Sequence, residues 1–253
     1  QLALARRRAL AANQRTVARR SISAGIQAAF DARLPFERTN GQREIGAVIE
    51  AELAAETPMH RLLQGEVGSG KTLVALRAML TVIDAGGQAA LLAPTEVLAT
   101  QHARSITGML GDLAEGGLLG GSVIGARVAL LTGSQSTAER KKALLEIASG
   151  QAGIVVGTHA LLQEHVQFAD LALVVVDEQH RFGVEQRDAL RGRGESPPHV
   201  LVMTATPIPR TVAMTVFGDL ETSTLSELPA GRGAITTTVI PESRPDWIDR
   251  ACH

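Results

Sequence analysis

The sequence predicts an α/β fold, with a mostly parallel β-sheet and helices on both faces of the sheet. From residue 60 onward, six short apolar runs suit strands that are covered on both faces. Segments with helical periodicity separate most of these runs, for example residues 72–84 and 137–148. The 253 residues, 45 % of them apolar, are enough for a sizeable buried core. The runs are "RLLQG", "AALLAP", "VALLTG", "GIVVGTH", "LALVVVDE" and "VLVMTAT".

The composition limits the classes of function. The formal net charge is −1, so any contact with nucleic acid must come from a local surface. The only cysteine, Cys252, excludes a disulfide framework and a thiolate metal cluster, and it fits a reducing cytosol. No apolar run of about 20 residues and no signal-peptide pattern is present, so we expect no membrane contact. Aromatic residues make up only 2 %, which predicts contacts to the nucleic-acid backbone rather than stacking on bases.

The chain begins with an Ala- and Arg-rich segment, residues 1–33, which we assign to a connecting helix and linker. Its stretch "RRRALAANQRTVARR" predicts a helix whose basic face could touch phosphates, although a solvated connecting helix is the more frequent outcome of such a pattern. The next stretch, "LPFERTNGQREI", leads into a helix before the first strand. By periodicity alone, Phe36 is expected in the core and Gln42 on the surface.

Two segments depart from the alternation of strands and helices. Residues 111–126, "GDLAEGGLLGGSVIGA", are predicted as a flexible surface loop, because no strand precedes their glycines and no lysine follows them. After about residue 217 the sheet pattern fades into a stretch rich in proline and glycine. We therefore assign residues 34–222 to one domain and residues 223–253 to a linker toward a further lobe.

Small, hydroxylated or acidic residues follow each apolar run. Because ligands of parallel sheets bind outside the carboxyl ends of the strands, these clusters should share one edge of the sheet. The clusters are Gly65 to Thr72, Pro94 to Glu96, Thr132 to Ser134, Gly157 to His159, Asp177 with Glu178, and Thr204 to Thr206.

The strongest local signal is "GEVGSGKT", which satisfies the pattern G-x-x-x-x-G-K-[ST] between a strand and a helix. The glycines let backbone N–H groups point at phosphate oxygens, and the following helix presents its positive N-terminal end. Lys71 would reach the terminal phosphates of a nucleotide, and the Thr72 hydroxyl would ligate Mg2+. The predicted phosphate loop consists of Gly65, Glu66, Val67, Gly68, Ser69, Gly70, Lys71 and Thr72.

A phosphate loop of this kind needs a carboxylate on a neighbouring strand to hold the metal. Asp177 ends the most apolar run in the chain and would hold Mg2+. Glu178 is placed to orient and deprotonate the attacking water. A lone "DE" after a strand is more often ordinary turn chemistry, so this assignment depends on the phosphate loop.

Together these segments resemble the superfamily 2 helicases, whose motor lobes are RecA-like P-loop NTPase domains. "LPFERTNGQ" resembles the adenine-recognising segment, "APTEVLATQH" motif Ia, "VVVDEQHRFGVEQR" motif II and "MTATPIPRT" motif III. The sequences "DEQHRFGVEQR", "MTATPIPRTVAMTVFGDL" and "ELPAGR" are most similar to the RecG-type branched-DNA helicases. The resemblance covers roughly residues 33–240. Transcription-repair coupling translocases, a related family, usually carry a second Glu where this chain has Gln179.

The resemblance implies that the nucleotide is ATP and that its metal is Mg2+. Gln42 would bind the adenine edge by a bidentate hydrogen bond, and Phe36 would shape that end of the pocket. His180, Thr204 and Thr206 would link the γ-phosphate site to the DNA side. For His180, a buried and hydrogen-bonded histidine is the alternative.

On the DNA side, the resemblance implies that Thr95, Thr158 and the backbone around Gly133 contact DNA phosphates. Thr95 is equally expected to be the N-cap of a helix that begins at Glu96. Both roles are compatible, since a capped helix N-terminus is itself a phosphate site.

The leading hypothesis is the first motor lobe of a bacterial, cytoplasmic, nucleoid-associated helicase that remodels stalled forks and Holliday junctions. The alternatives are a transcription-repair coupling lobe and a nucleotide-dependent switch without translocation. No motif of a second motor lobe and no segment long enough for a junction-binding wedge domain is present, and we do not expect an oligomer. We therefore expect this chain alone to hydrolyse ATP at little above background, unless Arg181 or Arg210 of a neighbouring copy acts as an arginine finger.

Overall fold

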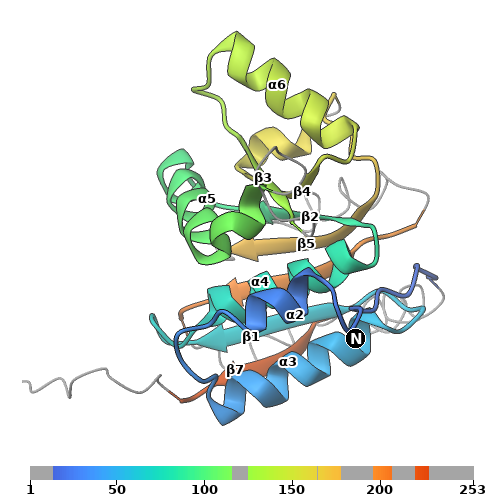
Figure 1. Cartoon of the computed structure of the whole chain (residues 1–253), viewed down its shortest axis with the longest axis vertical. Coiled ribbons are helices and arrows are strands. Elements are labelled where there is room, and N and C mark those ends of the chain that lie inside the picture. The colour runs from blue at the N-terminus through green and yellow to red at the C-terminus, as the bar shows by residue number, and fades with distance from the viewer. Residues whose placement is uncertain (1–13, 116–124, 164, 178–195, 207–219, 228–253) are drawn as a thin grey trace, which may run out of the picture.

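The computed structural model describes residues 14–115, 125–163, 165–177, 196–206 and 220–227. These residues form a sheet with the strand order β3-β4-β2-β5-β6-β1-β7, in which all neighbouring strands are parallel (Figure 1). All of the runs predicted as strands are strands, and the predicted fold class is confirmed. The strands are β1 (His60–Gly65), β2 (Gln88–Leu92), β3 (Arg127–Leu131), β4 (Ala152–Gly157), β5 (Leu171–Asp177), β6 (His199–Thr204) and β7 (Glu221–Leu225).

The helices α4, α5 and α6 connect successive strands as crossovers, whereas α2 and α3 precede β1. The predicted helices over residues 72–84 and 137–148 correspond to α4 and α6. None of the helices in the described residues is long and apolar enough to cross a membrane. The α-helices are α2 (Ile26–Asp31), α3 (Asn40–Leu53), α4 (Lys71–Asp84), α5 (Glu96–Leu110) and α6 (Thr137–Ala148), and two 3-10 helices are η1 (Gly111–Glu115) and η2 (His159–Leu162).

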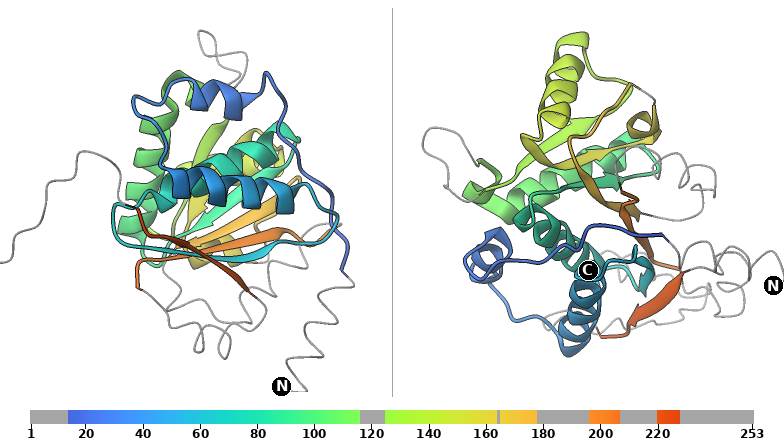
Figure 2. Two further views of the ribbon diagram at one scale, coloured as in Figure 1. Left: turned by 90° about the horizontal axis from the view of Figure 1, so that it is seen from below. Right: turned by 90° about the vertical axis from the view of Figure 1, so that its right-hand side faces the viewer.

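Apolar side chains cover both faces of the sheet. In β5, Leu173 and Val175 join the cluster that includes residues of α2, α3, α4 and α5. Val174 and Val176 join the other cluster, which includes residues of α6 together with Leu161, Val166 and Phe168. This alternation explains why the central strands are continuous apolar runs, because neither of their faces meets water. Figure 2 shows α3 and α4 lying side by side against one face of the sheet.

The described part of the N-terminal segment packs against the domain. Residues 14–20 form no helix, so the helix predicted for "RRRALAANQRTVARR" is wrong for this part of the stretch. Arg19 is 5 % exposed, and its guanidinium pairs with Asp170 just before β5 at 2.8 Å. Ile26 and Phe30 of α2 are buried in the core, and Asp84 at the end of α4 accepts hydrogen bonds from the first N–H groups of α2.

Two further expectations need correction. The sheet pattern does not end near residue 217, because β7 pairs with β1, and the boundary predicted at residue 222 lies within β7. β7 was missed because it is an edge strand with the polar sequence "ETSTL", which carries no apolar run. The segment 111–126 is not entirely a surface loop: Leu113 and Ala126 are 1 % and 2 % exposed and are joined by a backbone hydrogen bond of 2.8 Å.

A buried histidine lies at the amino ends of the central strands. His199, the first residue of β6, is fully buried, and its Nδ1 accepts a hydrogen bond of 3.0 Å from the backbone N–H of Met59. Burial lowers the pKa of His199 from its ordinary value of 6.5 to about 4, and the positive charge of Arg19 adds to this effect. The folded state therefore holds His199 neutral over a pH range in which the unfolded chain binds a proton.

Acidification is predicted to destabilise the fold through His199. Because the folded pKa lies below the unfolded one, stability is present above pH 6.5 and is lost as the pH falls toward 4. Between pH 7 and pH 5 this group should cost about 2 kcal/mol of unfolding free energy, measured by urea titration. His199→Asn keeps an acceptor for Met59 but cannot titrate, so it should lose this part of the pH dependence. If the free energy of unfolding of His199→Asn depended on pH as that of the wild type does, His199 would not be the group responsible.

Candidate functional site

The segment between β1 and α4 has the backbone of a phosphate loop. β1 ends at Gly65 and α4 begins at Lys71. Gly68 and Gly70 have φ angles of 85° and 89°, in the left-handed region that costs an L-residue energy but not glycine. The loop therefore leads from the carboxyl end of a strand directly into a helix N-terminus, the arrangement that binds phosphate.

Lys71 folds back over this loop. Its Nζ donates hydrogen bonds to the backbone oxygen of Gly65 at 2.6 Å and to that of Glu66 at 2.9 Å. The ammonium group thus lies above the loop, close to where phosphate oxygens would accept the same hydrogens. Thr72 follows in the first turn of α4, with its side chain partly buried.

Gln42 connects α3 to the phosphate loop. Its Nε2 donates a hydrogen bond of 2.9 Å to the backbone oxygen of Ser69, and its Oε1 accepts one of 3.1 Å from the backbone N–H of Thr39. A Cβ on residue 70 would lie 2.3 Å from Gln42 Nε2, so this contact requires glycine at that position. A primary amide has two hydrogens and two lone pairs, so Gln42 keeps one donor and one acceptor for a further partner.

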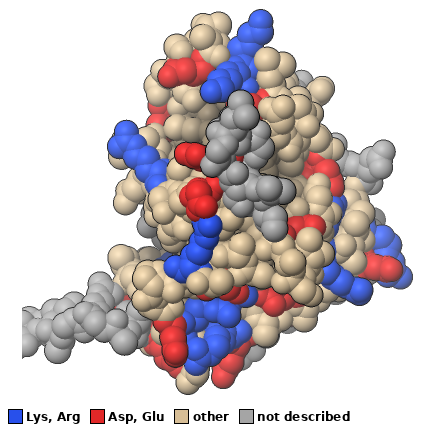
Figure 3. Space-filling model, in the orientation of Figure 1, with Lys and Arg blue, Asp and Glu red and all other residues tan. Residues whose placement is uncertain are grey.

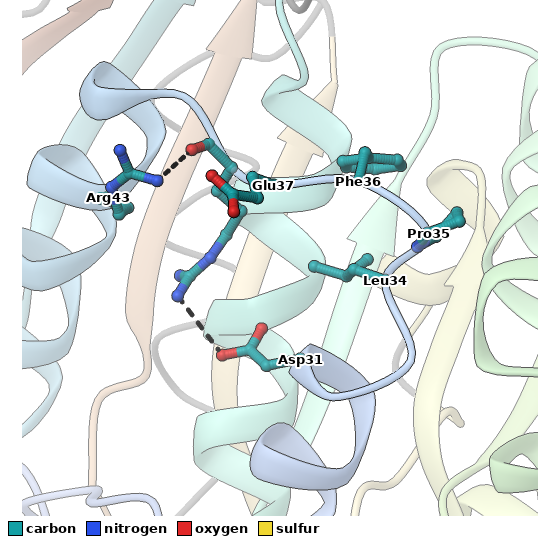
Figure 4. Close-up of a pocket in the computed structure, with 7 residues that line it drawn as sticks. Asp31, Leu34, Pro35, Phe36, Glu37 and Arg43 are labelled. Atoms are coloured by element: carbon teal, nitrogen blue, oxygen red, sulfur yellow. Dashed lines mark hydrogen bonds and ion pairs between the residues drawn. The ribbon is translucent and has the colours of Figure 1, made fainter.

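The positions that periodicity alone assigns to Gln42 and Phe36 are both wrong. Gln42 is 3 % exposed and lies in the first turn of α3, where it forms a capping box with Thr39. Its burial follows from the polar contacts of its amide, which hydrophobic periodicity does not record. Phe36 is 54 % exposed. It lines a shallow pocket beside the start of α3 (Figure 4), together with Asp31, Leu34, Pro35, Glu37, Arg38 and Arg43.

Asp177 lies at the end of β5, where it contacts a residue that the sequence reasoning missed. His102, in the second turn of α5, places its Nε2 2.6 Å from Asp177 Oδ2. Both side chains are mostly buried, at 15 % and 16 % exposed. The sequence contains no signal for this contact, because the two residues lie 75 positions apart.

Thr204 and Thr206 lie between the phosphate loop and Asp177. β6 pairs with β5 on one side, opposing Met203 to Asp177, and with β1 on the other, opposing Thr204 to Gln64. Thr204 is 1 % exposed, and its Oγ1 accepts a hydrogen bond of 3.2 Å from the N–H of Thr206. The hydroxyls of the two threonines are 3.0 Å apart, so the turn after β6 is held by its own polar groups.

The residues predicted to face DNA follow the other half of the sheet. Thr95 is exposed and caps α5 by accepting from the N–H of Leu98 at 3.3 Å, so the predicted N-cap is confirmed. Gly133 is also exposed, and its N–H donates to Glu96 Oε1 at 2.8 Å. Thr158 is only 2 % exposed, so it is the least accessible of the three residues.

Glu96 joins the first turn of α5 to the loop after β3. The side-chain hydrogen bond of Ser134, with those of the Gly133 and Ser134 N–H groups, lowers the pKa of Glu96 below its ordinary value. The Glu96 carboxylate thus accepts hydrogen bonds from the backbone N–H groups that the family resemblance implies for DNA phosphates. These N–H groups therefore point toward a position where an anionic oxygen can accept from them.

The strand order sorts the predicted site residues into two adjacent groups. The loops after β3, β4 and β2 carry Gly133, Thr158 and Thr95, and the ends of β5, β6 and β1 carry Asp177, Thr204 and the phosphate loop. All of these loops lie at one edge of the sheet, as predicted, because the strands are parallel. Glu178 and His180 lie outside the described residues, as do Arg181 and Arg210. Among the described residues there is no cluster of three or more His, Cys, Asp or Glu side chains placed to hold a metal ion.

Charges of both signs are interspersed on the face of the molecule shown in Figure 3. Blue and red side chains alternate there over the described elements, and no broad area of one sign covers that face. This distribution agrees with a formal net charge of −1.

The fold and the phosphate loop define a RecA-like nucleotide-binding lobe. The family model described as DEAD/DEAH box helicase matches residues 40–215, so the chain belongs to the DEAD/DEAH box helicase family.

Its similarity to individual proteins is more specific. The chain is 64 % identical over 232 residues to the ATP-dependent DNA helicase RecG of Mycobacterium tuberculosis (strain ATCC 25618 / H37Rv), covering 90 % of this chain and 32 % of the relative. It is 50 % identical over 226 residues to the ATP-dependent DNA helicase RecG of Escherichia coli (strain K12), covering 88 % and 31 %. The solved structure of RecG bound to a three-way DNA junction superposes with a TM-score of 0.80 at 36 % identity, covering 99 % of this chain and 31 % of that chain. The chain thus spans about a third of the length of the curated relatives that it matches.

The contact between Gly70 and Gln42 generates a prediction about stability. Gly70→Ala should lower the free energy of unfolding by about 1–2 kcal/mol, because alanine is strained in the left-handed region. Displacement of the Gln42 amide from Ser69 should lower it by about 1 kcal/mol more. Gly86 has a similar φ of 81°, but a Cβ there would meet nothing within 4 Å. Gly86→Ala should therefore lose only the strain energy. If urea unfolding showed the same loss of unfolding free energy in Gly70→Ala and Gly86→Ala, the Gln42 contact would not contribute to stability.

Proposed function

We propose that this chain is the first motor lobe of an ATP-dependent DNA helicase that remodels branched DNA such as stalled forks and Holliday junctions. The observation that carries the proposal is the strand order, which sets the phosphate loop, Thr204 and Asp177 on neighbouring strands beside the loops of Thr95 and Gly133. The similarity to RecG proteins supports a DNA helicase, and the likeness of 99 % of the chain to the structure of RecG bound to a three-way DNA junction supports branched DNA as the substrate.

In this proposal the nucleotide is ATP, and Lys71 moves from the loop carbonyls to the β- and γ-phosphates. Mg2+ fits the residues present, because the Thr72 hydroxyl and the Asp177 carboxylate are oxygen donors that this hard cation prefers. Mg2+ commonly takes few protein ligands and completes its shell with phosphate oxygens and water. When bound, it would neutralise the charge that develops on the transferred phosphoryl group. Glu178 would accept the proton of the attacking water.

Gln42 would select adenine. The donor and the acceptor that its amide keeps, besides the bonds to Ser69 and Thr39, match the N7 acceptor and the N6 donor of adenine. Phe36, at the rim of the neighbouring pocket, offers an exposed ring beside this end of the site.

Thr95, the backbone at Gly133, and Thr158 would face DNA phosphates, and DNA would displace Glu96 from the Gly133 N–H. Thr204, Thr206 and His180 would pass changes at the γ-phosphate to this side. Phosphoryl transfer also needs positive charge opposite the loop, typically an arginine finger that contributes about 10³–10⁵ in rate. We propose that a second lobe supplies it, so turnover is tested in a longer protein that carries both lobes.

Lys71→Ala should abolish ATP turnover in that two-lobed protein and greatly weaken nucleotide binding, because the terminal phosphates lose a full positive charge. Turnover is measured by phosphate release on a synthetic four-way junction. Glu178→Gln is the matched variant: it keeps the shape of the side chain and the Asp177 contact to the metal, so ATP should bind while hydrolysis falls about 10²-fold or more. Unchanged turnover in Lys71→Ala would refute the phosphate loop, and equal losses of binding and turnover in Glu178→Gln would make Glu178 structural.

Gln42→Ala should narrow the preference for ATP over GTP by about 1–3 kcal/mol, the value of a well-placed bidentate pair. The measurement is competition of ATP and GTP against a fluorescent nucleotide. Thr39→Ala is the control, because it removes the capping hydroxyl of α3 but leaves the Gln42 amide in place. The same preference in Gln42→Ala and wild type would exclude adenine recognition by this residue.

A further inference from the structure

α5 joins the two groups of strand-end residues. The helix follows β2, whose loop carries Thr95, and β2 pairs with β5, whose last residue is Asp177. At its first turn α5 holds the loop of Gly133 through Glu96. One to two turns later the same helix reaches Asp177 through His102.

The chemistry of the Asp177 carboxylate decides which group donates the hydrogen bond between His102 and Asp177. The distance between His102 Nε2 and Asp177 Oδ2 is 2.6 Å. An ionised carboxylate can only accept hydrogen bonds, so Nε2 carries the hydrogen and donates it. Both side chains are about one-sixth exposed, at 15 % and 16 %, so water competes weakly for either group.

A donor on one carboxylate oxygen restricts the rotation of the whole carboxylate. With Oδ2 held by His102, the plane of the Asp177 carboxylate and the direction of Oδ1 are set before a metal arrives. Carboxylates that ligate metals are commonly held by such outer hydrogen bonds, and loss of the outer partner typically weakens metal affinity or activity by about 10–100-fold.

We propose that His102 is a positioning residue that orients Asp177 toward the magnesium ion of the bound nucleotide. The inference rests on the proposed function, in which Asp177 is the metal ligand. It adds a residue that lies on the motif Ia helix rather than on the strands of the nucleotide site. A purely packing role for His102 would affect the stability of α5 but would not depend on the metal.

The experiment measures binding of a fluorescent ATP analogue to this chain, first with a chelator and then across a Mg2+ titration. His102→Ala should raise by about 10–100-fold the Mg2+ concentration at which the increase in analogue binding is half-maximal. Binding of the analogue in the presence of the chelator should be unchanged. His102→Gln should restore the wild-type midpoint, since its amide N–H reaches about as far as Nε2. His102→Asn carries the same amide one carbon shorter and should behave as His102→Ala.

Gln101→Ala is the control on the same helix, because Gln101 is exposed and adjacent in the chain. Urea unfolding of each variant without metal identifies any that fail to fold, and the comparison of Gln with Asn does not depend on the alanine variant. Equal Mg2+ midpoints in wild type, His102→Asn and His102→Ala would overturn the positioning role and leave the proposed function standing. Absence of any Mg2+-dependent nucleotide binding in the wild-type chain would overturn the proposed function and the positioning role together.

Discussion

The common direction of the strands is the constraint on which the site depends. Every crossover returns the chain to the same starting edge, so every strand in the described residues ends at the opposite edge. The strand direction thereby brings loops that are far apart in sequence to one side of the sheet. Ligand-binding groups lie at this edge because the loop backbone there is exposed and helix N-termini point toward it.

Among the strands that end at this edge, β6 separates the phosphate loop from Asp177. β6 lies between the strand that ends in the phosphate loop and the strand that ends in Asp177. In the proposed function, a change at the γ-phosphate would reach the DNA side through the turn of Thr204 and Thr206, whose polar groups contact one another.

Buried polar groups hold the surrounding elements in place. Gln88 of β2 donates from Nε2 to the backbone oxygens of Ile147 and Ala152, which ties α6 to the start of β4. Arg77 of α4 pairs with Asp31 and Glu50 and so joins α2, α3 and α4. Since α3 carries Gln42 and α4 follows the phosphate loop, these ion pairs hold the two elements that are predicted to bind the nucleotide next to each other. Such groups are costly to leave unpaired, so they specify one arrangement of the helices more than they add stability.

The sequence by itself determined the class of fold, the six apolar strands, the phosphate loop and the acidic strand end, because each of these is written in residues that are neighbours along the chain. Local patterns also predicted the Thr95 cap and the clusters at the strand ends. They failed for Gln42, whose burial comes from a hydrogen bond to Ser69 across 27 positions, and for β7, whose polar residues become a strand only by pairing with β1. Only the tertiary structure decided the order of the strands. That order separates the residues predicted to bind the nucleotide from those predicted to face DNA, and the packing of α5 brings His102 to Asp177. The reason is physical: periodicity reports which face of an element is buried, whereas strand order and polar contacts depend on which distant elements pack together.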